Sequence, residues 1–325
     1  MAATREPKTL QQAILFFSDY ANCHKAMVDL RWPNGTVCCP RCGSLRVSYL
    51  EKARVWKCYE SHPKAKFSLK VGTIFEDSPI GLEKWLPALW LVVNCKNGIS
   101  SYELGRALGV TQKTAWFMLS RLRLALQDKY TDGKLSGDVE LDETFIGGRA
   151  RYMHKAKRDR MGITQGRSMA GKVAVMGLLE RHGEGKPSRV RLAQVKSNKR
   201  SALMPHITEH VAPGSTVHTD ALKSYSTLMD SDYTHKVIDH AETYVDGNVH
   251  TNGLENFWSL LKRTIKGTYV SVEPFHLFRY LDEQAFRFNK REGNDQSRFY
   301  AALKGILGRR VTYTALTGAE LPETC

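Results

Sequence analysis

The chain has 325 residues, of which 42% are hydrophobic and 10% aromatic, so it is not disordered throughout and is long enough for two or three domains. Lys and Arg number 48 against 33 Asp and Glu, which gives a formal net charge of +15. This excess favours a polyanionic partner such as nucleic acid, although a merely basic surface would give the same count. The polar residues 1–12 lack a signal-peptide core, and the longest apolar run, Trp85 to Val93, is too short for a membrane span. We therefore expect a cytoplasmic protein with no membrane partner.

The first predicted region, residues 1–79, contains a helix over residues 10 to 30 and then a metal-binding motif. Cys39 and Cys42 form a CxxC pair, Cys58 follows after fifteen residues, and His62 follows after three more. Three thiolates and one imidazole can surround Zn²⁺ as a tetrahedron, so this spacing predicts a zinc ribbon with one structural Zn²⁺. Cys38 is adjacent but lacks the two-residue gap, and a set of buried free thiols is the alternative interpretation.

The second predicted region, residues 80–134, is helical. An apolar helix covers residues 82 to 94, and a helix, a turn and a second helix then run from Ser100 onward. Ser100 or Ser101 can cap the first helix of this pair, Gly109 permits the turn, and Thr111 can cap the second helix. The pattern is typical of a helix-turn-helix whose second helix contacts DNA, although a plain helical hairpin has the same pattern.

The third predicted region, residues 135–290, alternates between strands and helices, and residues 291–325 form a helical C-terminal extension. Three strands, a helix, a further strand and a late helix predict an α/β fold of the RNase H-like type, with a mixed sheet and flanking helices. Expected strands cover residues 139–146, 173–179, 190–194, 215–219 and 237–238, and expected helices cover residues 199–210, 254–265, 275–288 and 299–307.

Three carboxylates occupy positions where such a fold could bring them together. Asp142 lies near the end of the first strand, on the same face as Glu140, whereas Glu143 points the opposite way. Asp220 ends a later strand, and Glu255 lies on the polar face of the late helix. Lys262 follows Glu255 by seven residues, nearly two helical turns, so it could hold a phosphate beside the carboxylates. Such a group can bind two Mg²⁺ or Mn²⁺ ions for phosphodiester chemistry.

Asn252 precedes the late helix and either caps it or supplies a metal ligand through its carbonyl. Residues 149 to 172 contain eight Lys or Arg and one acid, which indicates a flexible clamp on DNA phosphates or simply a solvated loop. The side chains that we expect to contact DNA are Gln112, Lys113, Thr114, Arg121, Arg149, Arg151, Lys155, Lys157, Arg158, Arg160, Arg167, Lys172 and Lys266.

Several motifs together resemble a known family. The CxxC pair, the run from Lys66 to Phe75, the run from Leu141 to Gly148 and the run from His250 to Ser259 are similar to those of bacterial insertion-sequence transposases of the 1595 insertion-sequence superfamily. The resemblance covers roughly residues 15 to 290. Members of that family carry a zinc ribbon before a DDE-type catalytic domain.

The resemblance implies a DNA transposase of RNase H-like fold that uses two Mg²⁺ ions. Asp142, Asp220 and Glu255 match the metal-binding acids, and Lys262 matches the usual basic partner. The third acid varies among members, some of which have Asn, so Asn252 is the alternative to Glu255. The implied partners are the inverted repeats at the element ends, target DNA and further copies of the chain, on the bacterial nucleoid. A DNA-binding regulator with an inactive catalytic domain, and a metal-dependent nuclease of the same fold, are the alternative functions.

Overall fold

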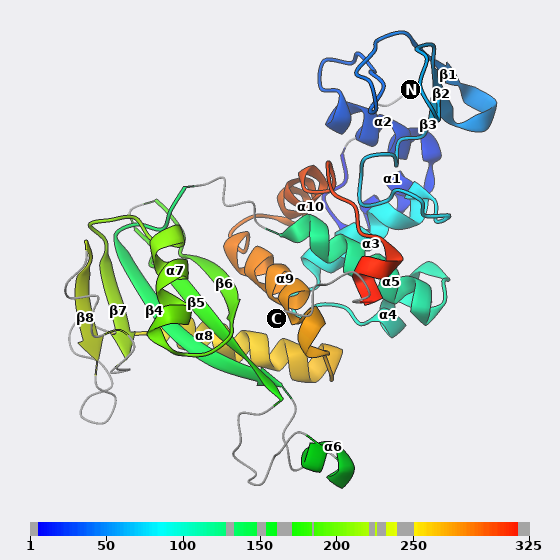
Figure 1. The fold of residues 1–325 in the computed structure, drawn as a ribbon. Helices are drawn as coiled ribbons and strands as arrows, with labels where there is room; N and C mark the ends of the chain where they lie inside the picture. The colour runs from blue at the N-terminus through cyan, green and yellow to red at the C-terminus, as the bar shows by residue number, and fades with distance from the viewer. Residues whose placement is uncertain are drawn as a thin grey trace. The chain divides into compact units, whose positions relative to one another are not determined.

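The computed structural model describes residues 6–127, 133–147, 154–160, 171–183, 185–220, 225, 232–238 and 250–317 (Figure 1). The chain divides into two compact units. The first unit contains Met1–Gln127 and Gly293–Leu321, and the second contains Asp128–Glu292 and Pro322–Cys325. Across the described ranges, every helix is too short or too polar to cross a membrane.

The first unit begins with two helices where the sequence predicts one. α1 (Leu10–Ser18) ends before Asp19, and α2 (Tyr20–Arg31) begins after it. Asp19 has an extended backbone, and its carboxylate accepts a hydrogen bond from the Ala21 N–H at 2.8 Å. The prediction of one continuous helix is wrong here because Asp is more stable as an N-cap than inside a helix.

The ribbon is a three-stranded antiparallel sheet in the order β1-β2-β3. β1 (Val47–Leu50) and β2 (Val55–Cys58) lie where the sequence predicts strands, whereas the two-residue β3 (Lys66–Phe67) was not expected. Trp56 pairs with Tyr49 on one side and Phe67 on the other, and its ring stacks on His24 of α2 at 5.2 Å. One face of the sheet is therefore packed against α2.

Three further helices in the first unit agree with the predicted elements. α3 (Leu82–Asn94) is the apolar helix, and α4 (Ser101–Leu108) and α5 (Gln112–Leu126) form the helical pair. Ser100 caps α4 in a capping box, Gly109 has a left-handed backbone with φ of 60°, and Thr111 caps α5. Each of these three local predictions is confirmed.

The end of the chain completes the core of the first unit. α10 (Asp295–Lys304) carries Phe299, which is fully buried, and α11 (Tyr313–Thr317) follows it. The Phe299 ring lies 5.4 Å from that of Phe17 in α1 and 5.2 Å from that of Trp90 in α3. Residues from the two ends of the sequence thus share one core.

The second unit is built on a mixed five-stranded sheet in the order β6-β5-β4-β7-β8 (Figure 1). β4, β5 and β6 are antiparallel neighbours, whereas β7 and β8 run parallel to β4. The strands agree with the predicted ones to within a few residues at each end. Their bounds are β4 (Asp138–Gly147), β5 (Lys172–Glu180), β6 (Arg189–Val195), β7 (Thr216–Asp220) and β8 (Thr234–Ile238).

Helices cover both faces of this sheet. α7 (Arg200–His210) packs on the face that contains Val139 and Leu141. α8 (Asn252–Thr264) and α9 (Leu277–Asn289) pack on the other face, where Glu140 and Asp142 also lie. A π-helix (Ile265–Tyr269) continues α8, and a 3₁₀ turn (Pro274–His276) precedes α9.

The segment between β4 and β5 contains a short helix, α6 (Lys155–Arg160). The predicted flexible clamp over residues 149–172 thus includes one short helix, and its contact with DNA stays a prediction. Four of the six are Lys or Arg, so the helix keeps the basic character that the prediction was based on.

Candidate active site and zinc site

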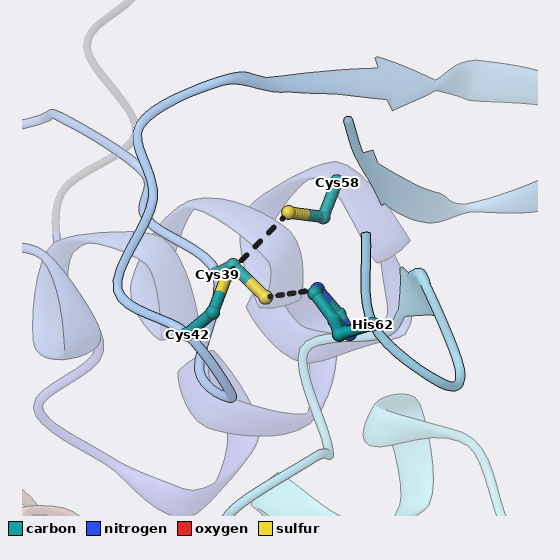
Figure 2. A group of neighbouring side chains, drawn as sticks. All are labelled: Cys39, Cys42, Cys58 and His62. Atoms are coloured by element: carbon teal, nitrogen blue, oxygen red, sulfur yellow. Dashed lines mark hydrogen bonds between the residues drawn. The ribbon is translucent and has the colours of Figure 1, made fainter. Parts of the chain in front are cut away.

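The four predicted zinc ligands come together in the first unit. One potential ligand atom from each of Cys39, Cys42, Cys58 and His62 lies within 4.8 Å of all the others (Figure 2). The Cys42 and Cys58 sulfurs are 3.6 Å apart. A tetrahedron of zinc–sulfur bonds has sulfur–sulfur edges of about 3.8 Å, so the arrangement fits Zn²⁺.

Local backbone geometry explains how the ligands meet. The Cys39 N–H donates to the Ser44 carbonyl, and the left-handed Gly43, with φ of 73°, donates to the Cys39 carbonyl. Cys58 ends β2, which brings it over this turn. Cys38 is instead held by Trp32, whose indole N–H donates to its sulfur at 3.2 Å, so Cys39 is the ligand that the CxxC spacing predicts.

The ligands differ in how readily they ionise: the pKa of Cys39 is lowered, whereas the pKa of Cys42 is raised and the Pro63 carbonyl raises the pKa of His62 to about 9. Burial opposes ionisation of Cys39, but hydrogen bonds from the Arg41 and Cys42 backbone outweigh it and lower the pKa of Cys39 to about 7. Metal binding needs the thiolate, so a lowered pKa reduces the free energy required to load the site at neutral pH. All four ligands come from the protein, which indicates a structural metal.

The second site begins with two acids on neighbouring parallel strands. Glu140 of β4 is level with His218 of β7, so Asp142 and Asp220, each two residues further on, reach the same level. Side chains two residues apart share a face of a strand, which aligns these two carboxylates on one face of the sheet. Asp220 ends β7 as predicted, but the prediction that Asp142 lies near the end of its strand is wrong, because pairing with β5 extends β4 to Gly147.

The third acid is carried by α8. Gly177, the β5 partner of Asp142, lies against α8 so closely that a Cβ there would be 2.6 Å from the Trp258 ring. The Trp258 indole N–H donates to Asp142 Oδ2 at 2.8 Å. Glu255, one turn before Trp258, is thereby held near Asp142, in the middle of β4.

The pKa of Asp142 responds to burial and to the other two acids. Burial is the main cause that raises the pKa of Asp142 to about 6, and the charges of Asp220 and Glu255 raise it further. The Trp258 and Glu143 N–H groups oppose this rise. A nearby divalent cation would remove the repulsion, so this donor set fits Mg²⁺ or Mn²⁺.

The three acids do not form a closed cage. Within the described residues, only two groups of three or more potential ligands have all their ligand atoms within 4.8 Å, and these acids are not one of them. Like charges favour separation, and Asp142 is already hydrogen-bonded by Trp258 and by the Glu143 N–H. The three carboxylates are therefore close enough for their charges to interact, but they do not form a preformed coordination shell.

Glu140 is a site residue whose role the sequence did not predict. It is 1% exposed, and its carboxylate accepts hydrogen bonds from the Leu254 N–H at 2.9 Å and from Arg181 Nε at 2.8 Å. His250 Nδ1 lies 3.4 Å from the same carboxylate. Glu140 thus fixes the N-terminus of α8 to β4, where the helix dipole also favours a negative charge. In the sequence, only the spacing of two residues from Asp142, which places Glu140 on the same face of β4, indicated that Glu140 belongs to this site.

Asn252 does not cap α8. The N-cap position is Thr251, no side chain caps the helix locally, and Asn252 is an exposed first-turn residue. The capping prediction for Asn252 is wrong because Glu140, distant in sequence, satisfies the Leu254 N–H instead. Lys262 and Lys266 are exposed, Lys262 on α8 and Lys266 in the π-helix that continues it.

The α4–α5 pair exposes part of the predicted DNA-contacting surface. Gln112 and Lys113 are exposed at the start of α5, while Thr114 is half-buried and its N–H donates to Thr111 Oγ1. Gln112 also donates to the Ser101 hydroxyl at 2.9 Å. These side chains are accessible, and their contact with DNA stays a prediction.

The prediction that Arg121 contacts DNA is wrong. Arg121 is 5% exposed, and its Nη1 donates to the carbonyls of Ile74 and Glu76 at 3.0 and 2.6 Å. Its guanidinium also lies 4.4 Å from the centre of the Phe117 ring. The side chain satisfies buried backbone carbonyls within the first unit, so it has no free face for a phosphate.

The basic segment after β4 is described in part. Lys155 is exposed and Arg158 half-buried in α6, and Lys172 is half-buried at the start of β5. Arg149, Arg151 and Arg167 lie outside the described residues, as do the side chains of Lys157 and Arg160.

A second His-containing group lies at the C-terminal end of α7, where His206, Glu209 and His210 have ligand atoms within 4.8 Å of one another. Burial lowers the pKa of His210; the charge of Glu209 opposes this, and Arg191, His206 and Lys134 lower it further. We assign no metal here.

Comparison with known proteins identifies the family. Residues 134–289 match the ISXO2-like transposase domain, and residues 18–61 match the transposase zinc-ribbon domain. An uncharacterized protein in transposable element ISH50 of Halobacterium salinarum is 30% identical over 271 residues, which are 81% of this chain and 88% of that protein. The chain belongs to the IS1595 transposase family.

This transposase is also 36% identical over 103 residues to an uncharacterized transposase-like protein of Haemophilus influenzae, a match of 31% of this chain and 83% of that protein. The family resemblance predicted from the motifs is confirmed. The DDE domain implies an RNase H-like fold, with which the mixed sheet agrees. The zinc-ribbon match ends at residue 61, so the assignment of His62 depends on its position beside the three cysteines.

Proposed function

We propose that this chain is a DDE-type DNA transposase that binds the terminal inverted repeats of its element, cleaves at the element ends and joins the 3′-hydroxyl to target DNA. The observation that supports this function best is the position of Asp142: strand register sets it level with Asp220 on the neighbouring strand, and it is hydrogen-bonded to Trp258, one helical turn from Glu255. The charges of Asp220 and Glu255 also contribute to raising the pKa of Asp142. Convergent carboxylates of this kind are the ligands that two-metal phosphoryl transfer requires.

Asp142, Asp220 and Glu255 are the proposed metal ligands, with Asn252 as the alternative to Glu255. Two Mg²⁺ or Mn²⁺ ions held there would activate the attacking oxygen and stabilise the leaving oxygen of an in-line displacement. Trp258 orients Asp142 through its indole N–H. Lys262, about 10 Å along α8 from Glu255, would hold a nearby DNA phosphate.

The rest of the chain would recognise and arrange DNA. One structural Zn²⁺ would hold the ribbon of residues 1–79, and the helical pair of residues 80–134 would act as a helix-turn-helix. Residues 135–290 would form the catalytic domain, and within residues 291–325 the helix α10 belongs to the core of the first unit. Two element ends must meet before joining, so we propose a dimer or larger assembly on the bacterial nucleoid in the cytoplasm.

Asp142→Asn tests this function. It keeps the side-chain shape but removes a metal-binding charge, so we expect binding of element-end DNA to persist while Mn²⁺-dependent cleavage falls roughly a thousandfold or more. Glu209→Gln, which removes an exposed carboxylate from α7 of the same unit, should leave cleavage unchanged. Gel-shift and cleavage assays give the two measurements.

A strand-transfer assay with a pre-cleaved end distinguishes the alternatives. The proposed transposase joins that end to target DNA, a nuclease would cut but never join, and a regulator would bind without cutting. Cleavage retained in Asp142→Asn would contradict the assignment of this residue.

A further inference from the structure

The outward face of the ribbon sheet has a composition that its packing does not explain. Register places Lys57 of β2 opposite Ser48 of β1 and opposite Lys66 of β3. This face is opposite the one that carries Trp56 and packs against α2, because neighbouring residues in a strand alternate sides. We define the outer ribbon face as Ser48, Lys57, Lys66 and the adjoining Tyr59.

The outer ribbon face pairs two like charges. Lys57 and Lys66 are exposed and directly opposite each other, and among the described residues neither has a carboxylate within 4.0 Å. Like charges at opposite positions destabilise an antiparallel pair. By contrast, the exposed Lys25 is neutralised by Asp29 at 2.6 Å. Because the Lys57–Lys66 pair is unfavourable and no acid compensates it, we infer that the two lysines are kept to bind a ligand and not to stabilise the ribbon.

Polar groups surround the two lysines. The Tyr59 hydroxyl shares a 2.9 Å hydrogen bond with the Ser48 hydroxyl, and the Lys57 ammonium lies 5.2 Å from the centre of the Tyr59 ring. Arg41 is exposed beside β3, with its Nη1 donating to the carbonyls of Lys64 and Lys66. The face therefore presents cations and hydroxyl groups, which are the donors that phosphate oxygens accept from.

The segment around the outer ribbon face is also positively charged. Residues 38 to 70 contain only two acids, Glu51 and Glu60, and Glu60 lies 3.5 Å from Arg46 and accepts from Ser44. The basic residues of this segment number eight: Arg41, Arg46, Lys52, Arg54, Lys57, Lys64, Lys66 and Lys70.

We propose that the outer ribbon face binds the phosphate backbone of duplex DNA, with Lys57 and Lys66 each neutralising one phosphate. Such contacts fix the position of the protein on DNA and carry no sequence information. The inference rests on the proposed function in that DNA is the substrate, and it goes further by naming the surface and the chemical group that it takes. DNA suits two adjacent cations because its charges are closely and regularly spaced.

The salt dependence of binding tests the proposal. The full-length protein is titrated with a fluorescein-labelled duplex of arbitrary sequence, without added magnesium or manganese, so that no cleavage occurs. Lys57→Gln and Lys66→Gln should each reduce the slope of log K against log salt by about 0.9, which weakens binding about eightfold at roughly 0.1 M salt. Lys25→Gln, the matched control, should change neither value because its partner is Asp29.

Ribbon stability supplies an independent readout with the opposite sign. Removing either charge relieves the Lys57–Lys66 repulsion, so Lys66→Gln should raise the melting temperature of the zinc-loaded protein while it weakens DNA binding. Lys66→Glu places opposite charges across the two strands and should increase both effects. A purely structural role for these lysines predicts a lower melting temperature.

The outcomes separate this inference from the proposed function. If the wild type binds the duplex strongly and the salt slope is unchanged in Lys57→Gln and Lys66→Gln, the proposal that the outer ribbon face binds DNA is wrong. The proposed transposase function would be unaffected. Reduced slopes in a protein that never cleaves DNA would support the face and count against the function. A wild-type protein that does not bind the arbitrary duplex would overturn the outer ribbon face, and the strand-transfer assay with element-end DNA would then decide the function by itself.

Discussion

Asp142 and Glu143 are neighbours in the chain and lie on opposite faces of β4, where their surroundings give them different roles. Burial, together with Asp220 and Glu255, raises the pKa of Asp142 to about 6, so this carboxylate is ionised at neutral pH. Burial, followed by the charges of Asp142 and Asp220, raises the pKa of Glu143 to about 8, and the Tyr225 hydroxyl donates to it. Glu143 is therefore mainly neutral, which agrees with its exclusion from the predicted metal ligands.

Glu143→Gln should stabilise the second unit, and more so as the pH rises. Between its ordinary pKa of 4.5 and the folded value of about 8, Glu143 holds a proton in the folded state that the unfolded chain releases. The wild-type free energy of unfolding therefore decreases as pH rises through this window, whereas the neutral Gln has no such dependence. We expect the advantage of the variant to reach a few kcal/mol at about pH 8 and to vanish below about pH 4.5.

Urea unfolding across this pH range measures the effect. Parallel pH profiles for the wild type and Glu143→Gln would show that Glu143 has no raised pKa in the folded state.

At the scale of the element, α8 is positioned by a contact distant in sequence. The carboxylate of Glu140 replaces a local N-cap, and Gly177 lets the Trp258 ring lie directly on the sheet. These two contacts fix the position of α8 on the sheet, and with it the position of Glu255 relative to Asp142. The proposed active site therefore depends on Glu140 and Gly177, which need not touch DNA.

Glu140→Ala should destabilise the second unit by about 3 kcal/mol or more, because Arg181, whose side chain is 11% exposed, would lose the carboxylate of a buried ion pair. Adding Arg181→Ala should cost less than the two single changes together, since no unpaired charge remains. A double-mutant cycle in urea measures this coupling. Strictly additive effects would mean that the ion pair does not hold α8.

At the scale of the whole molecule, each of the two units has its own core. Phe299 is buried between Phe17 and Trp90 in the first unit, and Phe257 is buried under the sheet of the second. Chain order alone would assign Phe299 to a separate C-terminal extension.

Phe299→Ala should therefore destabilise the first unit by about 3–5 kcal/mol and leave the second unit intact. Phe257→Ala is the matched control and should show the reverse pattern. Hydrogen exchange distinguishes the two units through the amides of α3 and of β4. If Phe299→Ala increased exchange in β4 as much as in α3, the two cores would not be independent.

The sequence by itself determined the features that depend on short range. The CxxC turn at Gly43, the capping box at Ser100, the left-handed Gly109 and the strands around Asp142 follow from local backbone preferences and from periodicity, and each is present. The family motifs are also local, so the transposase family could be identified before the structure was known.

Tertiary structure decided what depends on partners far along the chain. Arg121 has the pattern of a DNA-contacting residue, yet buried carbonyls of Ile74 and Glu76 take its donors. Asn252 has the pattern of a cap, yet Glu140 satisfies the helix N-terminus across 114 residues. A side chain forms the bonds that lower the free energy of the whole fold, and its sequence neighbours cannot specify which distant group will be beside it.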